Sequence, residues 1–347
     1  MLSKKYIPYA SLYELTLRCN MNCIHCGSSA GIKREKELTT DQWKKVTKDL
    51  SDMGAKFVTI LGGEPFLRKD WYEISKDIVD NGIELTIISN AMLINEKNIK
   101  KISKLKPYTI AISLDGGTSE THDYIRQTKG SFDKCLDALN LLKKSEINTS
   151  IVTTLSKTNL KDLPKIRDLI IDREIAWQIQ IAVPMGRFPR KLMLSKEEFY
   201  SAAMFIAACR QRYDIKKLPV MGAHCFGYFS KKLPNINVVP VWRVCQAGIT
   251  MLSVQSNGDV KGCLSLPDEF KEGNVLNKSL KDIWTEKDFS PYNRRFKKTQ
   301  LNGKCKECKY GKKCRGGCMS VSTSVTGKKN ADPYCLYQIE KEIKMPL

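Results

Sequence analysis

The feature that most constrains the fold is a repeated alternation of apolar and amphipathic segments through the first half of the chain. Strand-like apolar segments occur at residues 12–17, 57–61, 85–89, 109–114, 149–154 and 177–183. Helical spacing of apolar residues between them predicts helices at 40–53, 71–81, 132–144 and 160–172. Such alternation is typical of a parallel sheet with right-handed crossovers. We therefore predict an α/β fold, open or curled into part of a barrel, whose site lies at the C-terminal ends of the strands.

Three cysteines lie on the loop after the first predicted strand. Cys19, Cys23 and Cys26 fall within eight residues, so we expect their thiols to emerge together from the C-terminal end of that strand. Three thiolates can hold three irons of a cubane and leave the fourth iron open to a small molecule. A structural zinc site with His25 as the fourth ligand fits the same residues. The loop alone therefore predicts a metal centre of one of these two kinds.

The composition is that of an ordinary globular protein, with 347 residues, of which 42% are hydrophobic and 27% charged. The N-terminal residues lack the apolar stretch of a signal peptide, and no segment approaches the roughly 18 apolar residues of a membrane span. We therefore expect a cytoplasmic protein without a membrane partner. Its 13 cysteines would then be reduced and available as ligands, and cysteine must dominate because only 3 histidines are present.

The chain is strongly basic, with a formal net charge of +21. The lysines are spread along the sequence, which fits either an acidic partner or a solvated lysine-rich surface. Nucleic acid is the less favoured partner, because the basic residues do not interleave with aromatic residues that could stack on bases.

Polar motifs follow three further strands. Gly62-Gly63-Glu64-Pro65 comes after the second strand, where glycines allow close backbone approach to a ligand and a carboxylate can accept from an ammonium group. Ser89-Asn90 ends the third strand. Ser113-Leu114-Asp115-Gly116 ends the fourth and is followed by His122 and Arg126.

Together with the CX3CX2C loop, these motifs resemble the radical S-adenosylmethionine (SAM) enzymes, over about residues 11–190. In that family the open iron binds the amino and carboxylate groups of SAM, and an electron splits the sulfonium into methionine and a 5′-deoxyadenosyl radical that abstracts hydrogen. The resemblance implies cluster ligation by Cys19, Cys23 and Cys26. It implies a cofactor site at Gly62, Gly63, Glu64, Ser89, Asn90, Ser113 and Arg126.

Within that site, the resemblance assigns the SAM amino group to the motif of Glu64, the ribose to Ser89 and Asn90, and the carboxylate to Ser113. Asp115, like His122 and Arg126, fits a structural hydrogen-bonding role equally well. Asp115 is also one of two candidates for a catalytic residue.

The C-terminal part is rich in cysteine. The alternation stops past Pro189, a helix is expected at about 195–213, and eight of the thirteen cysteines lie from Cys225 onward. Segments 251–255 and 260–264 alternate around an Asn-Gly pair, which predicts a tight hairpin that brings Cys263 toward Cys245. The following CX2CX5CX3C block is too polar to form a core and needs metal to order it. A pair of zinc ribbons would also explain these cysteines.

The order of these cysteines, CX12GX4C, then CX2CX5CX3C, then a last cysteine, resembles the SPASM domain of peptide-maturing radical SAM enzymes. The resemblance implies two auxiliary 4Fe-4S clusters, and hence three clusters in all. It assigns the distal cluster to Cys305, Cys308, Cys314 and Cys335, and the proximal one to Cys245, Cys263 and Cys318. The proximal cluster is one ligand short.

The missing proximal ligand has two explanations. The iron could be open, and would then bind a substrate thiolate or accept the substrate electron. Alternatively, Cys225 could reach it from upstream. Cys225 also fits a buried structural thiol or a hydrogen-atom donor, which makes it the second catalytic candidate.

We therefore predict a partial (βα)6 barrel of the radical SAM type at 1–190, a helical linker at 191–240 and a SPASM domain at 241–347. The predicted function is reductive SAM cleavage followed by modification of a ribosomally synthesised peptide, such as a thioether or carbon-carbon crosslink. The implied partners are an acidic precursor peptide and a flavodoxin- or ferredoxin-type reductant. Because the first strand begins near residue 11, recognition of a leader sequence would need the barrel mouth, the C-terminal domain or a separate leader-peptide-binding protein.

Other functions fit parts of the same pattern. A peptide epimerase, a sulfatase-maturing formylglycine enzyme and a haem-pathway oxidative decarboxylase share the architecture. The sulfatase role is disfavoured because Leu264 follows Cys263, where those enzymes carry an aspartate. From another class, a zinc-dependent or nucleic-acid-binding protein would account for the charge and the cysteine loops.

Overall fold

The structure is a computed structural model that describes residues 6–226, 229–230, 232–233, 236–237 and 244–343. Part of the linker predicted at 191–240 therefore lies outside the described residues. Among the described helices, none combines the length and apolar character required to cross a lipid bilayer.

The described residues form one sheet of ten strands in the order β10-β9-β8-β1-β2-β3-β4-β5-β6-β7. Neighbouring strands from β1 to β7 are parallel. These strands are β1 (Ala10–Thr16), β2 (Phe57–Gly62), β3 (Glu84–Ser89), β4 (Thr109–Ser113), β5 (Thr149–Leu155), β6 (Ala176–Ile181) and β7 (Val220–Gly222). The six predicted strands are confirmed, each within two residues at either end. β7 is an addition, since a strand of 3 residues is too short to show a period.

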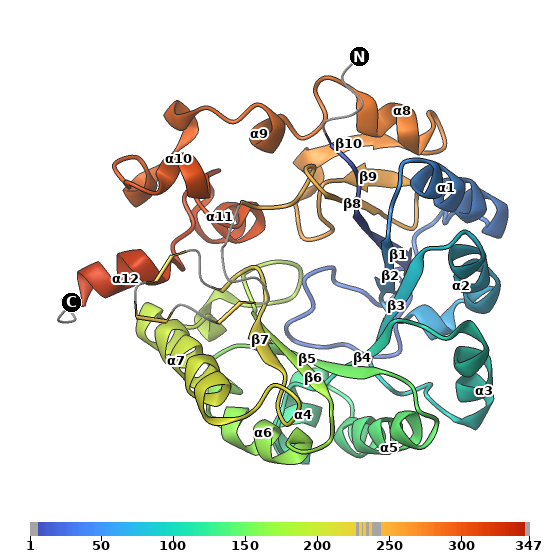
Figure 1. Ribbon diagram of the computed structural model, residues 1–347. Helices are drawn as coiled ribbons and strands as arrows, with labels where there is room; N and C mark the ends of the chain where they lie inside the picture. The colour runs from blue at the N-terminus through green and yellow to red at the C-terminus, as the bar shows by residue number, and fades with distance from the viewer. Residues whose placement is uncertain (1–5, 227–228, 231, 234–235, 238–243, 344–347) are drawn as a thin grey trace.

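Helices cover the outer face of the curved sheet (Figure 1). They are α1 (Thr40–Asp52), α2 (Trp71–Asp80), α3 (Glu96–Leu105), α4 (Ser119–Arg126), α5 (Ser131–Lys144), α6 (Leu163–Ile170) and α7 (Lys196–Arg212). Helix α1 begins after its N-cap residue Thr39, which forms a capping box with Gln42. The helix predicted at 160–172 is instead a short 3-10 turn followed by α6.

The alternation along each strand separates the helix-covered face from the inner face. In β6, Trp177 and Ile179 are fully buried, whereas Gln178 and Gln180 are partly exposed. A polar, partly exposed inner face beside a fully apolar outer one is the arrangement of a curled sheet with an accessible interior. The partial barrel predicted from the sequence is therefore confirmed.

The C-terminal part extends the same sheet. β8 (Met251–Val254) and β9 (Asp259–Lys261) form the predicted antiparallel hairpin, and β10 (Lys271–Asn274) pairs with β9. β8 also pairs in parallel with β1, from Ala10 opposite Met251 to Tyr13 opposite Val254. Nothing local in the sequence marks this pairing.

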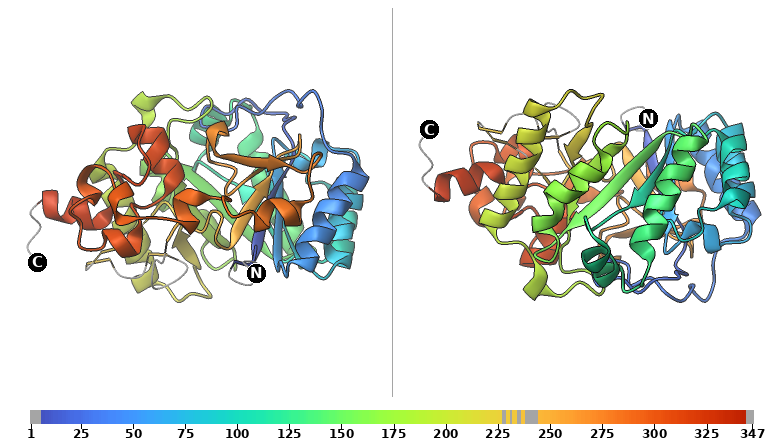
Figure 2. Two further views of the ribbon diagram at one scale, coloured as in Figure 1. Left: turned by 90° about the horizontal axis from the view of Figure 1, so that it is seen from above. Right: turned by 90° about the horizontal axis from the view of Figure 1, so that it is seen from below.

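The remaining helices complete the C-terminal part: α8 (Leu280–Thr285), α9 (Pro291–Arg294), α10 (Gly311–Cys314), α11 (Met319–Thr326) and α12 (Leu336–Glu342). In Figure 1, α9 to α12 lie between the β8–β10 end of the sheet and α7. Both views of Figure 2 place α12 at the opposite end of the molecule from α1 and α2.

Candidate active site

The loop with Cys19, Cys23 and Cys26 leaves the C-terminal end of β1, as predicted. Backbone bonds close its base, because Cys19 N donates to Gly31 O at 2.9 Å and Gly31 N donates to Leu17 O at 3.0 Å. Burial raises the pKa of Cys19 to about 11, and the charges of Cys23 and Cys26 add to this shift. The three thiols are therefore close enough to act on one another electrostatically.

The end of β2 packs directly on this loop. Gly63 N donates to Thr16 O at 2.8 Å, and Glu64 N donates to Arg18 O at 2.9 Å. A Cβ atom would lie 2.2 Å from Thr16 O at Gly62, and 2.2 Å from Arg18 O at Gly63. These contacts explain why both positions require glycine for packing alone, independently of the cofactor role predicted for them.

The Glu64 side chain joins three of the predicted cofactor residues. Its fully buried carboxylate accepts from Ser89 Oγ at 2.9 Å and from Asn90 N at 2.8 Å. The Asn90 amide nitrogen donates to Asn20 Oδ1 at 2.7 Å and lies 3.9 Å from Cys19 Sγ. Burial raises the pKa of Glu64 to about 7 despite these donors. The ends of β2 and β3 thus meet the cysteine loop in one polar group.

A second polar group forms where β4 ends. Asp115 Oδ2 lies 2.5 Å from Arg126 Nη2 and 3.2 Å from His25 Nε2, and Asp115 Oδ1 accepts from Thr154 N at 2.7 Å. Although burial opposes its charge, Arg126 and His25 hold the pKa of the Asp115 carboxyl well below its usual range. Arg126 Nη1 also lies 3.8 Å from Cys23 Sγ. These contacts favour the structural interpretation of Asp115 and Arg126, in which they orient the cysteine loop.

His122 is a neutral member of this group. Asp115 N donates to His122 Nδ1 at 3.1 Å, which places the ring proton on Nε2, 3.7 Å from Cys135 Sγ. Burial lowers the pKa of His122 to about 4. Ser113, the predicted carboxylate contact, is partly exposed at the end of β4, and its carbonyl oxygen accepts from Cys135 Sγ at 3.6 Å.

Sequence reasoning missed Arg187, on the segment after β6. Arg187 Nε donates to Cys23 O at 3.1 Å, its Nη1 donates to Ala30 O at 2.8 Å and its backbone N donates to Cys26 O at 3.0 Å. In the same segment, Arg190 donates to two carbonyl oxygens of α11. The Pro-Met-Gly-Arg sequence after the sixth strand was the available signal, since the other motifs also follow strand ends.

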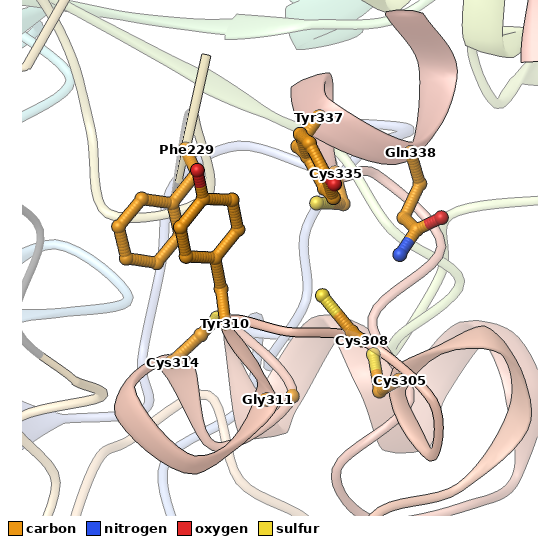
Figure 3. Close-up of a pocket in the computed structure, with 10 residues that line it drawn as sticks. Phe229, Cys305, Cys308, Tyr310, Gly311, Cys314, Cys335, Tyr337 and Gln338 are labelled. Atoms are coloured by element: carbon orange, nitrogen blue, oxygen red, sulfur yellow. The ribbon is translucent and has the colours of Figure 1, made fainter. Parts of the chain in front are cut away.

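The four cysteines predicted for the distal cluster line one cavity (Figure 3). Its wall also includes the aromatic rings of Phe229, Tyr310 and Tyr337. Burial raises the pKa of Cys305 to about 11 and that of Cys335 to about 12. Among the described residues, no three His, Cys, Asp or Glu side chains are grouped tightly enough for a single metal ion.

The cysteines predicted for the proximal cluster lie beside the distal set. Cys245 packs with Cys263 against one apolar group and with Cys318 against a second, which also contains Cys314 and Cys335. Cys225 Sγ accepts from Ile181 N at 3.3 Å, at the C-terminal end of β6.

The chain combines a partial parallel barrel, which carries three thiols at the end of its first strand, with a cavity lined by four further cysteines. This combination is typical of enzymes that hold iron–sulfur clusters. Two family models match the chain: the radical SAM superfamily over residues 13–170 and the SPASM iron–sulfur cluster-binding domain over residues 245–309. The chain is therefore an enzyme that contains a radical SAM domain followed by a SPASM domain. The family predicted from the motifs is confirmed.

Several relatives match nearly the whole chain. An AdoMet-dependent heme synthase of Methanosarcina barkeri is 27% identical, over 99% of this chain and 100% of that protein. The mycofactocin maturase MftC of Mycolicibacterium smegmatis is 28% identical, over 90% of this chain and 79% of that protein.

Solved structures share the fold. Streptococcus suis SuiB bound to S-adenosylmethionine has a TM-score of 0.75 at 21% identity, covering 91% of this chain and 74% of that one. Native anSMEcpe with bound AdoMet and Cp18Cys peptide has a TM-score of 0.69 at 21% identity, covering 96% of this chain and 95% of that one. SuiB has also been solved bound to its precursor peptide SuiA.

Proposed function

We propose that this enzyme cleaves SAM reductively and uses the resulting radical to modify a ribosomally synthesised peptide, with a crosslink such as a thioether or carbon-carbon bond. The observation that carries the proposal is the meeting of two polar groups, around Glu64 and around Asp115, on one three-cysteine loop. Two proteins that share the fold bind peptides, SuiB the precursor peptide SuiA and anSMEcpe the Cp18Cys peptide.

The residues of the site fit a cluster and SAM. Cys19, Cys23 and Cys26 would hold the cluster, which supplies the electron for SAM cleavage when bound. Burial raises the pKa of Glu64 to about 7 because it removes the ionised carboxylate from water. A cationic partner, such as the SAM amino group, would compensate that charge. Asn90, bonded to both Glu64 and Asn20, would keep that carboxylate aligned with the loop. Arg126 would hold Cys23 in place through its contact with the sulfur.

We also propose that the chain binds three 4Fe-4S clusters. The cavity lined by Cys305, Cys308, Cys314 and Cys335 supports the distal assignment. For the proximal set, we propose Cys225, whose sulfur lies at the C-terminal end of β6, as the missing ligand. Replacing Cys225 with Ala should then create an open iron, which the Mössbauer spectrum of the reconstituted protein would show as a distinct iron site. An unchanged spectrum would leave the open-iron alternative.

The peptide function is tested with the anaerobically reconstituted enzyme, SAM, dithionite and the short peptides encoded beside its gene. We expect 5′-deoxyadenosine and a peptide that has lost two hydrogens for each crosslink. The Cys19→Ala variant should form neither product. Formation of 5′-deoxyadenosine with no change in any of these peptides would contradict the peptide part of the proposal.

A second candidate is a reaction on a carboxylate-rich tetrapyrrole. Relatives named AdoMet-dependent heme synthase and Fe-coproporphyrin III synthase align with 99% and 96% of this chain, and a net charge of +21 fits a polyanionic substrate as well as an acidic peptide. Incubation with iron-coproporphyrin separates the two candidates, since loss of carbon dioxide from the porphyrin would favour this one. A separate leader-peptide-binding protein stays a prediction.

A further inference from the structure

The segment that carries three of the distal cysteines is strongly basic. Residues 303–315, GKCKECKYGKKCR, contain six basic residues and one acidic residue. Lys306, Lys309, Lys312 and Lys313 are exposed, and none of the ion pairs among the described residues includes them. Lys304, by contrast, pairs with Glu342. Four cationic side chains therefore point to solvent with their charge uncompensated.

Aromatic rings hold two of these four cations beside the cysteine cavity. Tyr310 stacks on Phe229, with ring centroids 4.2 Å apart and planes 10° apart, and meets Tyr337 edge-on at 4.9 Å. The Lys309 ammonium lies 5.1 Å from the Tyr310 ring centroid, and the Lys313 ammonium lies 5.6 Å from that of Phe229. The same three rings line the cavity (Figure 3). One layer of side chains therefore separates the basic surface from the distal cysteines.

The distal cysteines themselves come close to solvent. Cys305 and Cys308 are partly exposed, whereas Cys314, from the same segment, is buried. A redox group held here would be reachable by electron transfer from a protein docked on the basic surface. Redox encounters of this kind use small, transient interfaces, and charge complementarity raises their association rate.

We propose that Lys306, Lys309, Lys312 and Lys313 form a docking surface for an acidic one-electron carrier protein, which exchanges electrons with a cluster held by the distal cysteines. In the forward direction, the reduced carrier loses one electron and the enzyme gains it. The inference rests on the proposed function, because it requires a cluster in the distal cavity and a reaction in which one electron enters the enzyme to cleave SAM. An acidic peptide substrate is the other occupant that this charge would attract.

The test replaces three lysines, Lys309→Glu, Lys312→Glu and Lys313→Glu, in the reconstituted holoenzyme. The matched control reverses two exposed lysines of α3, Lys97→Glu and Lys100→Glu, which lie across the molecule from α10 (Figure 1). The probe is an acidic flavodoxin, whose binding in the oxidised form is measured separately from turnover. We expect its Kd to rise roughly tenfold or more in the triple variant near ~0.05 M salt, and to change less than about twofold in the control.

Salt provides a second criterion. The difference between the triple variant and the parent should shrink at ~1 M salt, where the Debye length falls to about 3 Å. A triple variant with the same Kd as the parent, or a difference that salt does not reduce, would overturn the proposal. Iron content and circular dichroism check the fold, and the Lys→Gln triple variant repeats the test with a smaller change of charge.

Dithionite-driven SAM cleavage separates this inference from the proposed function. Dithionite needs no protein docking, so we expect the triple variant to cleave SAM within about twofold of the parent rate. Lack of SAM cleavage by the parent would contradict the proposed function, while the flavodoxin Kd would still decide the docking surface. A raised KM for a peptide substrate with an unchanged flavodoxin Kd would assign the surface to the peptide and overturn the proposal.

Discussion

Replacing Arg187 with Met should loosen the cysteine loop without changing any predicted cluster ligand. The guanidinium donates two hydrogen bonds, to the carbonyl oxygens of Cys23 and Ala30, at 3.1 and 2.8 Å. A hydrogen bond that involves a charged group contributes about 1.5–3 kcal/mol. Both bonds are only partly buried, so the lower value applies and their loss favours opening of the loop by about 3 kcal/mol. That free energy corresponds to an opening equilibrium about 100-fold more favourable.

The assay is the loss of SAM cleavage after an iron chelator is added to the reconstituted enzyme. A chelator reaches the cluster only through the open loop, so the decay should be about 10- to 100-fold faster in Arg187→Met. Arg190→Met is the matched control, because Arg190 also donates two bonds to carbonyl oxygens, at 3.1 and 3.0 Å, but to α11. We expect its decay rate to stay near that of the parent.

Two results would refute the reasoning about Arg187. If Arg187→Met decays at the parent rate, the two bonds do not hold the loop. If both variants decay equally fast, the effect belongs to the whole segment after β6 rather than to the contacts of Arg187. Arg187→Lys, which keeps the charge but cannot reproduce both bonds, should lie between Met and the parent.

Three further predictions concern iron, backbone packing and pH. Iron analysis of the reconstituted protein should give about 12 irons per chain, falling to about 8 in the Cys305→Ser/Cys308→Ser variant, and an unchanged count would contradict the distal assignment. Gly63→Ala places a Cβ 2.2 Å from a backbone oxygen, so urea unfolding should show a free energy of unfolding lower by about 2–3 kcal/mol. The control Gly31→Ala, with no atom within 4 Å of its Cβ, should lose much less, and equal losses would contradict the steric account. Because burial lowers the pKa of His122 to about 4, below its ordinary value of 6.5, the unfolded chain binds this proton more readily, and the contribution of His122 to stability should fall by about 2 kcal/mol from pH 7 to pH 5. The His122→Gln variant should lack this part of the pH dependence, and parallel curves for variant and parent would contradict it.

The first half of the fold could be predicted because its signals are local. Apolar strands bounded by capped helices, such as the one that starts after Thr39, show their period within a few residues. The order of elements then fixes the parallel sheet and its site-bearing edge. The polar motifs that meet on the cysteine loop could also be predicted from local signals, because each motif directly follows a predicted strand.

Other features were hidden because they depend on distant contacts. The pairing of β1 with β8 joins residues about 240 positions apart. In the order of apolar and polar residues, neither strand differs from a strand at the edge of a sheet. Arg187 looks like an ordinary loop arginine until its contacts with Cys23 and Ala30 are seen. The roles of the glycines were also incomplete, because a Gly-Gly pair does not reveal whether a ligand or the backbone near Thr16 comes close.

The pairing of β1 with β8 has a consequence for how the chain is made. During synthesis, β1 emerges from the ribosome early, and its partner β2 follows within about 40 residues, but its other edge stays unpaired until Met251–Val254 has been translated. Contacts this far apart form late and slow folding, and an open strand edge invites pairing with other chains. At the ~5–20 residues per second of translation, that edge waits roughly ten seconds or more for its partner. A chain that stops before β8 would therefore tend to aggregate.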